Sequence, residues 1–408
     1  MLRSIVAVSG VVIVLVASST VLSAQDTRVA TLEQQRAEKA KRLEPYRPGR
    51  IEKLLLYIER EDPLGKISPH NGFFIRYGYA GKPLGAGMGL SAGYRHDLFG
   101  RRARVLGEAG TSLRKYRMLR GDFSLPYLAR DRFELGFEAT YRHDPQEDFY
   151  GPGPDSLESD RVNYLYDRTE FQGRAIYKPV PSVQVGARFG RVNPEVGPGR
   201  DSRFPSLEQL FREADAPGLG AQPDFNHAGL FGIVDRRDER GNPRAGSYYG
   251  VIWRRYSDLD LDRHDFRLLS IDLQHFIPVF DKKRVFALRG RVVTTTPEAG
   301  HTVPFYMQPP LGGNESLRSV ADFRFRDNNA LAFNVEYRWE ATSWLDMALF
   351  TDWGKVAARA KDLDLGDLER AYGIGFRFNS SKTVFFRADI ALWGGETPRY
   401  FLKFNKAF

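Results

Sequence analysis

From about residue 73 to the end of the chain, hydrophobic and polar side chains alternate with a period of two. Such alternation is typical of β-strands that have one apolar face and one polar face. The run 329–339 shows it most clearly: its apolar face carries Leu331, Phe333, Val335, Tyr337 and Trp339, and its polar face carries Ala332, Asn334, Glu336 and Arg338. The runs 133–142 and 372–378 repeat the pattern, so the sequence predicts an all-β protein.

About sixteen runs of this kind follow one another, most of them about ten residues long, which is typical of transmembrane β-barrels. They lie near residues 73–79, 86–97, 103–112, 116–124, 133–143, 163–177, 183–192, 226–235, 245–256, 266–276, 285–295, 329–339, 344–354, 371–379, 383–392 and 399–408.

The connections between these runs are short at one end of the predicted sheet and mostly long at the other. Short turns at residues 179–182, 278–282, 340–343 and 379–382 alternate with long loops at 143–161, 191–225, 297–328 and 355–370. Outer-membrane barrels have short periplasmic turns and longer outer loops, whereas a soluble β-sandwich gives no reason for such a bias. We therefore expect residues 71–408 to form a transmembrane antiparallel β-barrel of about 16 strands in contact with outer-membrane lipid.

Residues 1–24 have the layout of a signal peptide. Arg3 precedes an apolar core, and small residues that include Ser23 and Ala24 precede the polar Gln25. Leu22 fits the cleavage pattern poorly, which leaves an uncleaved anchor helix as the alternative. Either interpretation takes the rest of the chain out of the cytoplasm.

Residues 25–70 show no strand alternation and predict a short periplasmic segment with two helices, 31–43 and 50–61. The second helix has one apolar stripe, formed by Ile51, Leu54, Leu55 and Ile58. We expect this stripe to dock on a larger body, and a disordered linker is the alternative. Whether helix 50–61 plugs the barrel, lies on the membrane or binds a partner stays open.

Composition excludes several classes of protein. The mean hydropathy of −0.42 and the scatter of charges leave residues 1–24 as the one apolar run long enough for a membrane helix, which excludes a polytopic helical membrane protein. The absence of cysteine excludes disulfides, zinc–thiolate sites and iron–sulfur clusters. The net charge of +9 arises from Lys and Arg interleaved with 51 acidic residues, which does not indicate a nucleic-acid partner.

Motifs of enzymes and metal sites are missing from the sequence. It has no Gly-x-Ser-x-Gly, His-Glu-x-x-His or phosphate-binding loop, and its 7 histidines have no recognisable catalytic partners. The acidic stretches 143–148 and 258–262 lack the glycine and terminal glutamate of an EF-hand loop. We therefore expect no enzyme, no metal site and no cofactor.

The stretch 309–319 reads Pro-Pro-Leu-Gly-Gly-Asn-Glu-Ser-Leu-Arg-Ser and lies between the eleventh and twelfth predicted strands. It resembles the signature loop of the bacterial surface antigen family, the BamA/TamA-type outer-membrane barrels, with Gly312 and Gly313 followed by Arg318. The family's loop tip continues with Gly and an aromatic residue, whereas this chain has Ser319 and Val320. The family's transporters also carry periplasmic POTRA domains, and residues 25–70 are too few for one complete unit.

Further matches follow the family's order along the chain. Glu336 resembles the acidic position of the next strand, and Phe350, Asp352 and Gly354 resemble the Phe-x-Asp-x-Gly of the strand after it. The family's inner turn after the eighth strand is matched at Asp235, Asp238, Pro243 and Gly246. The closing face resembles the terminal strand of outer-membrane barrels and carries Tyr400, Leu402, Phe404 and Phe408.

The polar face of two neighbouring predicted strands carries a pair of carboxylates, Glu336 and Asp352. Both point into the predicted lumen, where two close carboxylates require a cation. If loop 297–328 folds inward, Arg318 supplies a planar bidentate donor for them. The alternative is a solvated Arg318 and two acids in a watery lumen.

The resemblance implies a role in outer-membrane protein insertion, translocation or envelope assembly, with unfolded outer-membrane proteins or periplasmic partners as clients. It also implies a weak seam between the first strand, 73–79, and the last, 400–408. The alternative is a passive channel or a structural barrel that handles no client. The client, accessory partners and the oligomeric state cannot be read from the sequence.

Overall fold

A computed structural model describes residues 71–77, 86–379, 384–394 and 398–404, with isolated positions between 31 and 57. It divides the chain into two compact units, residues 1–53 and 54–408. The isolated described positions 31, 34, 35, 38, 50, 53 and 57 are helical, but the expected signal peptide and the apolar stripe of helix 50–61 lie outside the described residues. No helix among the described residues is long and apolar enough to cross a membrane.

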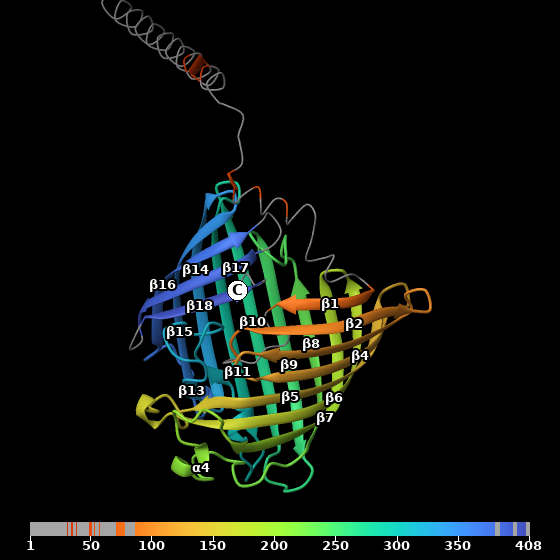
Figure 1. The fold of residues 1–408 in the computed structure, drawn as a ribbon, viewed down its shortest axis with the longest axis vertical. Coiled ribbons are helices and arrows are strands. Elements are labelled where there is room, and N and C mark those ends of the chain that lie inside the picture. The colour runs from red at the N-terminus through yellow and green to blue at the C-terminus, as the bar shows by residue number, and fades with distance from the viewer. Residues whose placement is uncertain are drawn as a thin grey trace, which may run out of the picture. The chain divides into compact units, whose positions relative to one another are not determined.

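Sixteen strands of the second unit form one antiparallel sheet in which each strand pairs with the next one along the chain (Figure 1). They are β1 (Gly72–Tyr77), β2 (Gly89–Leu98), β3 (Ala103–Ser112), β4 (Arg117–Leu128), β5 (Phe133–Phe149), β6 (Val162–Val180), β7 (Val183–Pro198), β8 (Phe225–Asp235), β9 (Gly246–Asp258), β10 (Phe266–Val279), β11 (Arg284–Pro297), β14 (Asn329–Thr342), β15 (Leu345–Ala357), β16 (Glu369–Asn379), β17 (Val384–Trp393) and β18 (Arg399–Phe404). The predicted all-β fold and its strand number are confirmed.

Apolar and polar side chains of each strand go to opposite faces of the sheet. On β14 the inner face is buried and polar, with Asn334, Glu336 and Arg338 at most 4% exposed. On β5 the outer face is apolar, and Phe137 is 49% exposed. On β18, Tyr400 and Leu402 are 72% and 55% exposed on the outer face, whereas the side chain of Phe404 and all of Phe408 lie outside the described residues. The outer face is therefore the one that suits contact with lipid.

Strands β5, β6 and β7 are longer than the sequence predicts. Residues 143–149 and 192–198, expected in loops, continue β5 and β7, and both pair with β6. The outer face of these ends is polar, as at Asn193 and Glu195 of β7, so they lack the apolar outer face that marks a lipid-facing strand in the sequence. Their backbones still pair, with a register shift between Asp144 and Glu147.

The long connections gather at one end of the sheet, which we call the loop end; the short turns lie at the other, the turn end. The short helices of the loop end are η1 (Glu158–Asp160), α4 (Leu207–Leu210), η2 (Phe305–Met307) and η3 (Ala360–Asp362), and α4 is visible at the lower end of Figure 1. An apolar cluster joins two of these helices to a strand: Phe149 of β5, Leu207 of α4 and Phe305 of η2 are fully buried together. We call it the loop-end cluster.

The apolar outer face of β5 allows the assignment of the outer and inner faces of the sheet to be tested. Replacing Phe137 by Arg places a charge on the apolar outer face of β5, and we expect a loss of about 2 kcal/mol of folding free energy in lipid. Thr140→Arg, on the inner face of the same strand, is the matched control and is expected to change it much less. Urea titrations in lipid vesicles measure both variants, and equal losses contradict the assignment of faces.

Candidate functional site

The connection between β11 and β14, residues 298–328, is the longest loop of the described chain, and we call it the long loop. It contains η2 and a two-stranded ribbon of β12 (Pro310–Leu311) with β13 (Phe325–Arg326). Gly312 and Gly313 follow β12 with positive φ angles of 129° and 74°, a region that favours glycine. The hydroxyl of Ser316 binds the carbonyl oxygen of Gly312 and accepts its backbone N–H, both at 2.9 Å, so this turn is tightly tied.

An apolar underside packs the long loop onto the inner face of the sheet. Leu311 and Leu317 of the loop are 1% and 0% exposed, and Val320 packs against the same cluster. The inner-face partners are Ala330 and Ala332 of β14, Val356 of β15 and Ala371 of β16. Small side chains on the wall leave room for the loop, which therefore lies inside the barrel at these strands.

Arg318 stands at the centre of the site and is 2% exposed. Its Nε and Nη2 donate to the two oxygens of the Asp352 carboxylate at 2.8 and 2.6 Å, and its Nη1 donates to Glu336 Oε1 at 2.6 Å. The backbone N–H of Arg318 also donates to Asp352, at 3.1 Å. The guanidinium stacks on Phe350, 3.5 Å from the ring centroid. The structure thus brings together the three residues that the sequence singled out, with Phe350 below them.

The site extends to three arginines and an aspartate that the sequence did not single out. Asp389 of β17 accepts from Arg377 at 2.6 Å and lies 3.3 Å from Arg318. Arg377 and Arg387 bind Glu336 at 3.0 and 3.1 Å, Arg387 also binds Asp389, and Arg338 binds Glu336 at 2.8 Å. We call these seven residues the lumenal cluster: Arg318, Arg338, Arg377, Arg387, Glu336, Asp352 and Asp389.

All members of the lumenal cluster are buried, so its charges have little water to stabilise them. A buried ion network is stable when every charge has a partner, and removal of one partner typically costs about 3–5 kcal/mol. Three carboxylates neutralise most of the charge of four arginines here. The long loop contributes one of those arginines, so its position and the balance of the cluster depend on each other.

Two glycines of β16 make room for the cluster. A Cβ at Gly373 would collide with the ring of Phe350 and with the carbonyl oxygen of Ile390. A Cβ at Gly375 would collide with Arg377 and Asp389. Glycines at alternate inner positions next to the motif strand were therefore a signal in the sequence for a crowded site.

The family of the chain follows from a comparison with known domains. The Omp85 superfamily domain matches residues 97–400, well over half of the chain. The chain belongs to the Omp85 superfamily. It is a bacterial outer-membrane β-barrel, and Omp85 barrels are in general insertion and transport proteins. No curated protein sequence matches it.

Solved structures that share the fold include the following two. BamA from Haemophilus ducreyi lacking POTRA domains 1–3 aligns with a TM-score of 0.61 at 16% identity, over 82% of this chain and 69% of that one. CdiB from Escherichia coli aligns with a TM-score of 0.52 at 12% identity, over 82% of this chain and 62% of that one. The chain thus spans less than two thirds of the CdiB chain.

The tip of the long loop departs from the Omp85 pattern without visible strain. Ser319, which stands where the family pattern has Gly, does not have a positive φ angle. Its hydroxyl donates to the carbonyl oxygen of Arg370 at 3.2 Å, and Val320 packs into the apolar underside. A side chain is therefore tolerated at this position of the Omp85 loop.

Of the remaining motif positions, Gly354 lies on β15, where an added Cβ would crowd Leu311 of the long loop. The others lie in and beside the turn between β8 and β9, at the turn end. Asp235 pairs with Arg237 at 2.9 Å. Asp238 accepts from the backbone N–H groups of Arg244 and Ala245 and from Lys282 of the neighbouring turn, all at 3.0–3.1 Å. Burial alone would raise the pKa of Asp238, but these hydrogen bonds hold it below its ordinary value.

The same turn reaches other strands. Pro243 is buried and Gly246 begins β9. The guanidinium of Arg244 binds Asp346 of β15 at 2.7 Å, and the carbonyl oxygen of Gly241 accepts the backbone N–H of Val384 of β17 at 3.2 Å. The turn therefore connects β8 and β9 to the strands that carry the lumenal cluster.

The close approach of Phe350 to Gly373 allows the packing of the site to be tested. Gly373→Ala forces Phe350 and the guanidinium stacked on it to move, and we expect a loss of about 2 kcal/mol of folding free energy from overpacking. Gly121→Ala, where an added Cβ meets no atom within 4 Å, is the control and is expected to change stability by much less. Thermal unfolding of both variants measures the difference, and equal effects contradict the crowding at β16.

Proposed function

We propose that this Omp85 barrel inserts proteins into the outer membrane or moves them across it, and that the long loop stays inside the barrel while it does so. The observation that carries the proposal is the lumenal cluster, in which Arg318 of the loop meets carboxylates of β14, β15 and β17 within 3.3 Å. An ion network of this kind fixes the loop by several charge-assisted hydrogen bonds at once. The sheet edge, rather than the lumen, is then the working surface.

Two sets of contacts, at different heights in the barrel, hold the long loop and support a lumen that the loop closes. The lumenal cluster holds the tip of the long loop, and the loop-end cluster holds its η2 segment against β5 and β6. Each set of contacts narrows the lumen at its own height, so loss of either set widens the path for solutes. This arrangement supports a client-handling barrel over the second hypothesis, a passive channel.

The two edge strands support the same proposal. β1 and β18 are six residues long each, and among the described residues β1 pairs with β2 alone and β18 with β17 alone. Backbone groups on the free side of an edge strand can pair with an added strand. We propose that an unfolded outer-membrane protein adds a strand at this seam, between residues 73–79 and 400–408. Phe404 and Phe408 would close the last strand on its lipid face.

The segments before the barrel complete the proposal. Residues 1–24 direct export as a signal peptide, and residues 25–70 form a helical periplasmic segment that helps to recruit a client or a periplasmic partner. The proposed sites for the family's function are thus the seam and the long loop.

The rate at which an unfolded model barrel protein folds into liposomes tests the proposed activity. We expect vesicles that contain this protein to accelerate folding several-fold over empty vesicles, because the edge strands offer a template. Vesicles that contain an unrelated folded barrel are the control for changes in the bilayer. If the preparation is folded and the rate equals that control, the insertion activity of the isolated protein is contradicted.

The conductance of single barrels in planar bilayers tests the plug. Arg318→Ala leaves Glu336, Asp352 and Asp389 without their shared cation, and we expect conductance to rise several-fold and the folding free energy to fall by about 3–5 kcal/mol. Arg188→Ala removes an inner-face arginine that has no ion pair among the described residues, and is the matched control. If Arg318→Ala matches the parent in both measurements, the loop is not held by this cluster.

A further inference from the structure

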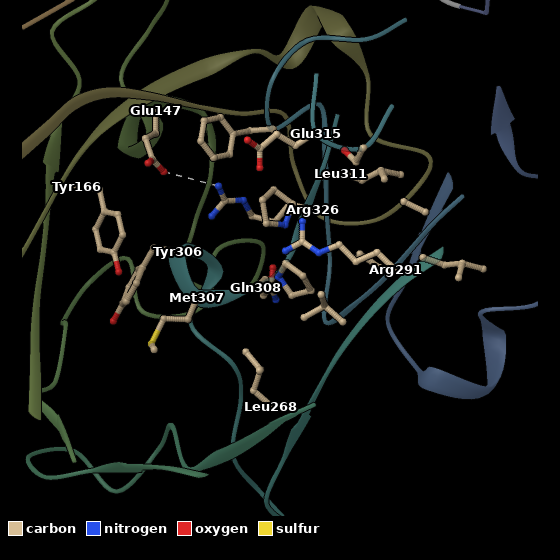
Figure 2. A pocket seen from close by; sticks show the side chains of 18 of the residues that line it. Glu147, Tyr166, Leu268, Arg291, Tyr306, Met307, Gln308, Leu311, Glu315 and Arg326 are labelled. Atoms are coloured by element: carbon tan, nitrogen blue, oxygen red, sulfur yellow. Dashed lines mark ion pairs between the residues drawn. The ribbon is translucent and has the colours of Figure 1, made fainter. Parts of the chain in front are cut away.

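A cavity of about 410 Å³ lies between the long loop and the inner face of the sheet (Figure 2). One side of it is formed by the long loop, from Tyr306 to Leu311 and at Arg326. The other side is formed by inner-face residues of β6, β9, β10, β11 and β14. Its size falls within the range of small-molecule sites, which are typically about 300–1,000 Å³.

The cavity has an apolar side. In Figure 2 Tyr166 and Tyr306 lie next to each other, with Met307 and Leu268 beyond them. The rings of Tyr166 and Tyr306 are 5.3 Å apart, and Phe266 continues the wall. This side is suited to a hydrocarbon chain or a ring rather than to an ion.

The opposite side of the cavity is cationic. Figure 2 shows the side chains of Arg291 and Arg326 extending into the cavity from different walls. Arg291 has neither an ion pair nor a hydrogen-bond partner among the described residues. Arg326 is 2% exposed; its Nη1 donates to the carbonyl oxygen of Phe305 at 2.8 Å, but its Nε has no hydrogen-bond partner within the described part of the chain. A buried guanidinium N–H without an acceptor is costly, so this wall favours an oxyanion.

Among the described residues, the carboxylates of the cavity pair with Arg326 but not with Arg291 (Figure 2). Glu147 is 3.8 Å from Arg326 and accepts the hydroxyl hydrogen of Tyr164 at 2.8 Å. Glu315 lies 3.4 Å from Lys403 of β18. Arg168, the third arginine that lines the cavity, lies 3.9 Å from the buried Asp144. Among the described residues, the positive charge that is left without an ion pair is therefore that of Arg291.

We propose that this cavity binds a small amphipathic anion, a carboxylate or phosphate on a short apolar body. Its oxyanion binds the guanidinium of Arg291, on the side of the cavity where Arg326 adds positive charge, and its apolar body packs against Tyr166, Tyr306 and Met307. Because the ligand touches both the long loop and the sheet, occupancy stabilises the loop inside the barrel. The proposal goes beyond the insertion function and does not depend on it.

The probes are octanoate, octyl phosphate, inorganic phosphate and octanol. Each probe is titrated into the full chain in nanodiscs of neutral lipid. We expect octanoate, octyl phosphate or both to bind and to raise the thermal unfolding midpoint, and octanol to do neither. Binding of one of the two anions alone identifies the head group. We expect Arg291→Gln to weaken binding roughly tenfold or more, since hydrogen bonds to charged groups are the stronger ones.

Arg188→Gln is the matched control, because Arg188 is an inner-face arginine without an ion pair that does not line the cavity. Arg291→Lys keeps the charge and is expected to retain more binding than Arg291→Gln. Subtracting a titration into empty nanodiscs of the same lipid removes the partition of the probes into lipid. The proposal is overturned if octanol binds as tightly as the anions, if inorganic phosphate binds as tightly as octyl phosphate, or if Arg291→Gln behaves like Arg188→Gln.

The outcome is separable from that of the insertion assay. Loss of anion binding in Arg291→Gln with unchanged acceleration of barrel folding supports the cavity and leaves the proposed function standing. Absence of anion binding in the parent overturns the cavity and again leaves the insertion proposal to its own assay.

Discussion

A guanidinium that is almost fully buried must be neutralised by groups that are equally buried. Arg318 is such a guanidinium, and the structure around it depends on the carboxylates that neutralise it. The carboxylates that meet it come from β14, β15 and β17, so three strands must stand in one relative register for the site to exist. Their acids in turn attract Arg338, Arg377 and Arg387. The position of one loop residue thus depends on the pairing of a quarter of the sheet.

The need to bury and neutralise Arg318 also explains several local features around the long loop. Phe350 lies under the guanidinium, and that ring leaves no space for a side chain at Gly373. The alanines of β14 and β16 are small because the loop packs directly on them. At the turn end, Arg244 binds Asp346 of β15 and so connects the β8–β9 turn to the wall that carries the cluster. The ion pairs, the apolar packing and the strand register around the long loop therefore depend on one another.

The strands could be predicted because lipid on one side and a polar interior on the other impose a period of two on every strand. The prediction was incomplete where that constraint ends, as at residues 143–149 and 192–198, which pair as strands without facing lipid. In the site, Arg318, Glu336 and Asp352 could be singled out because each lies in a stretch that resembles a family motif, and because the two acids share the polar face of neighbouring predicted strands. Asp389, Arg377 and Arg387 could not, because their approach to Arg318 depends on the curvature of the sheet across β16 and β17, which no local pattern records.

The long loop is held by chemically different contacts along its length. Its η2 segment is held by apolar packing, its tip by ion pairs, and the cavity with Arg291 and Arg326 lies between these two attachments. Release of the tip alone leaves the η2 segment in place, and release of η2 alone leaves the charges paired. Displacement of the whole loop therefore requires both contact sets to open, whereas loss of one set frees the loop only at that height. Under the proposed function, the edge strands β1 and β18, rather than the interior, are the surface that a client meets.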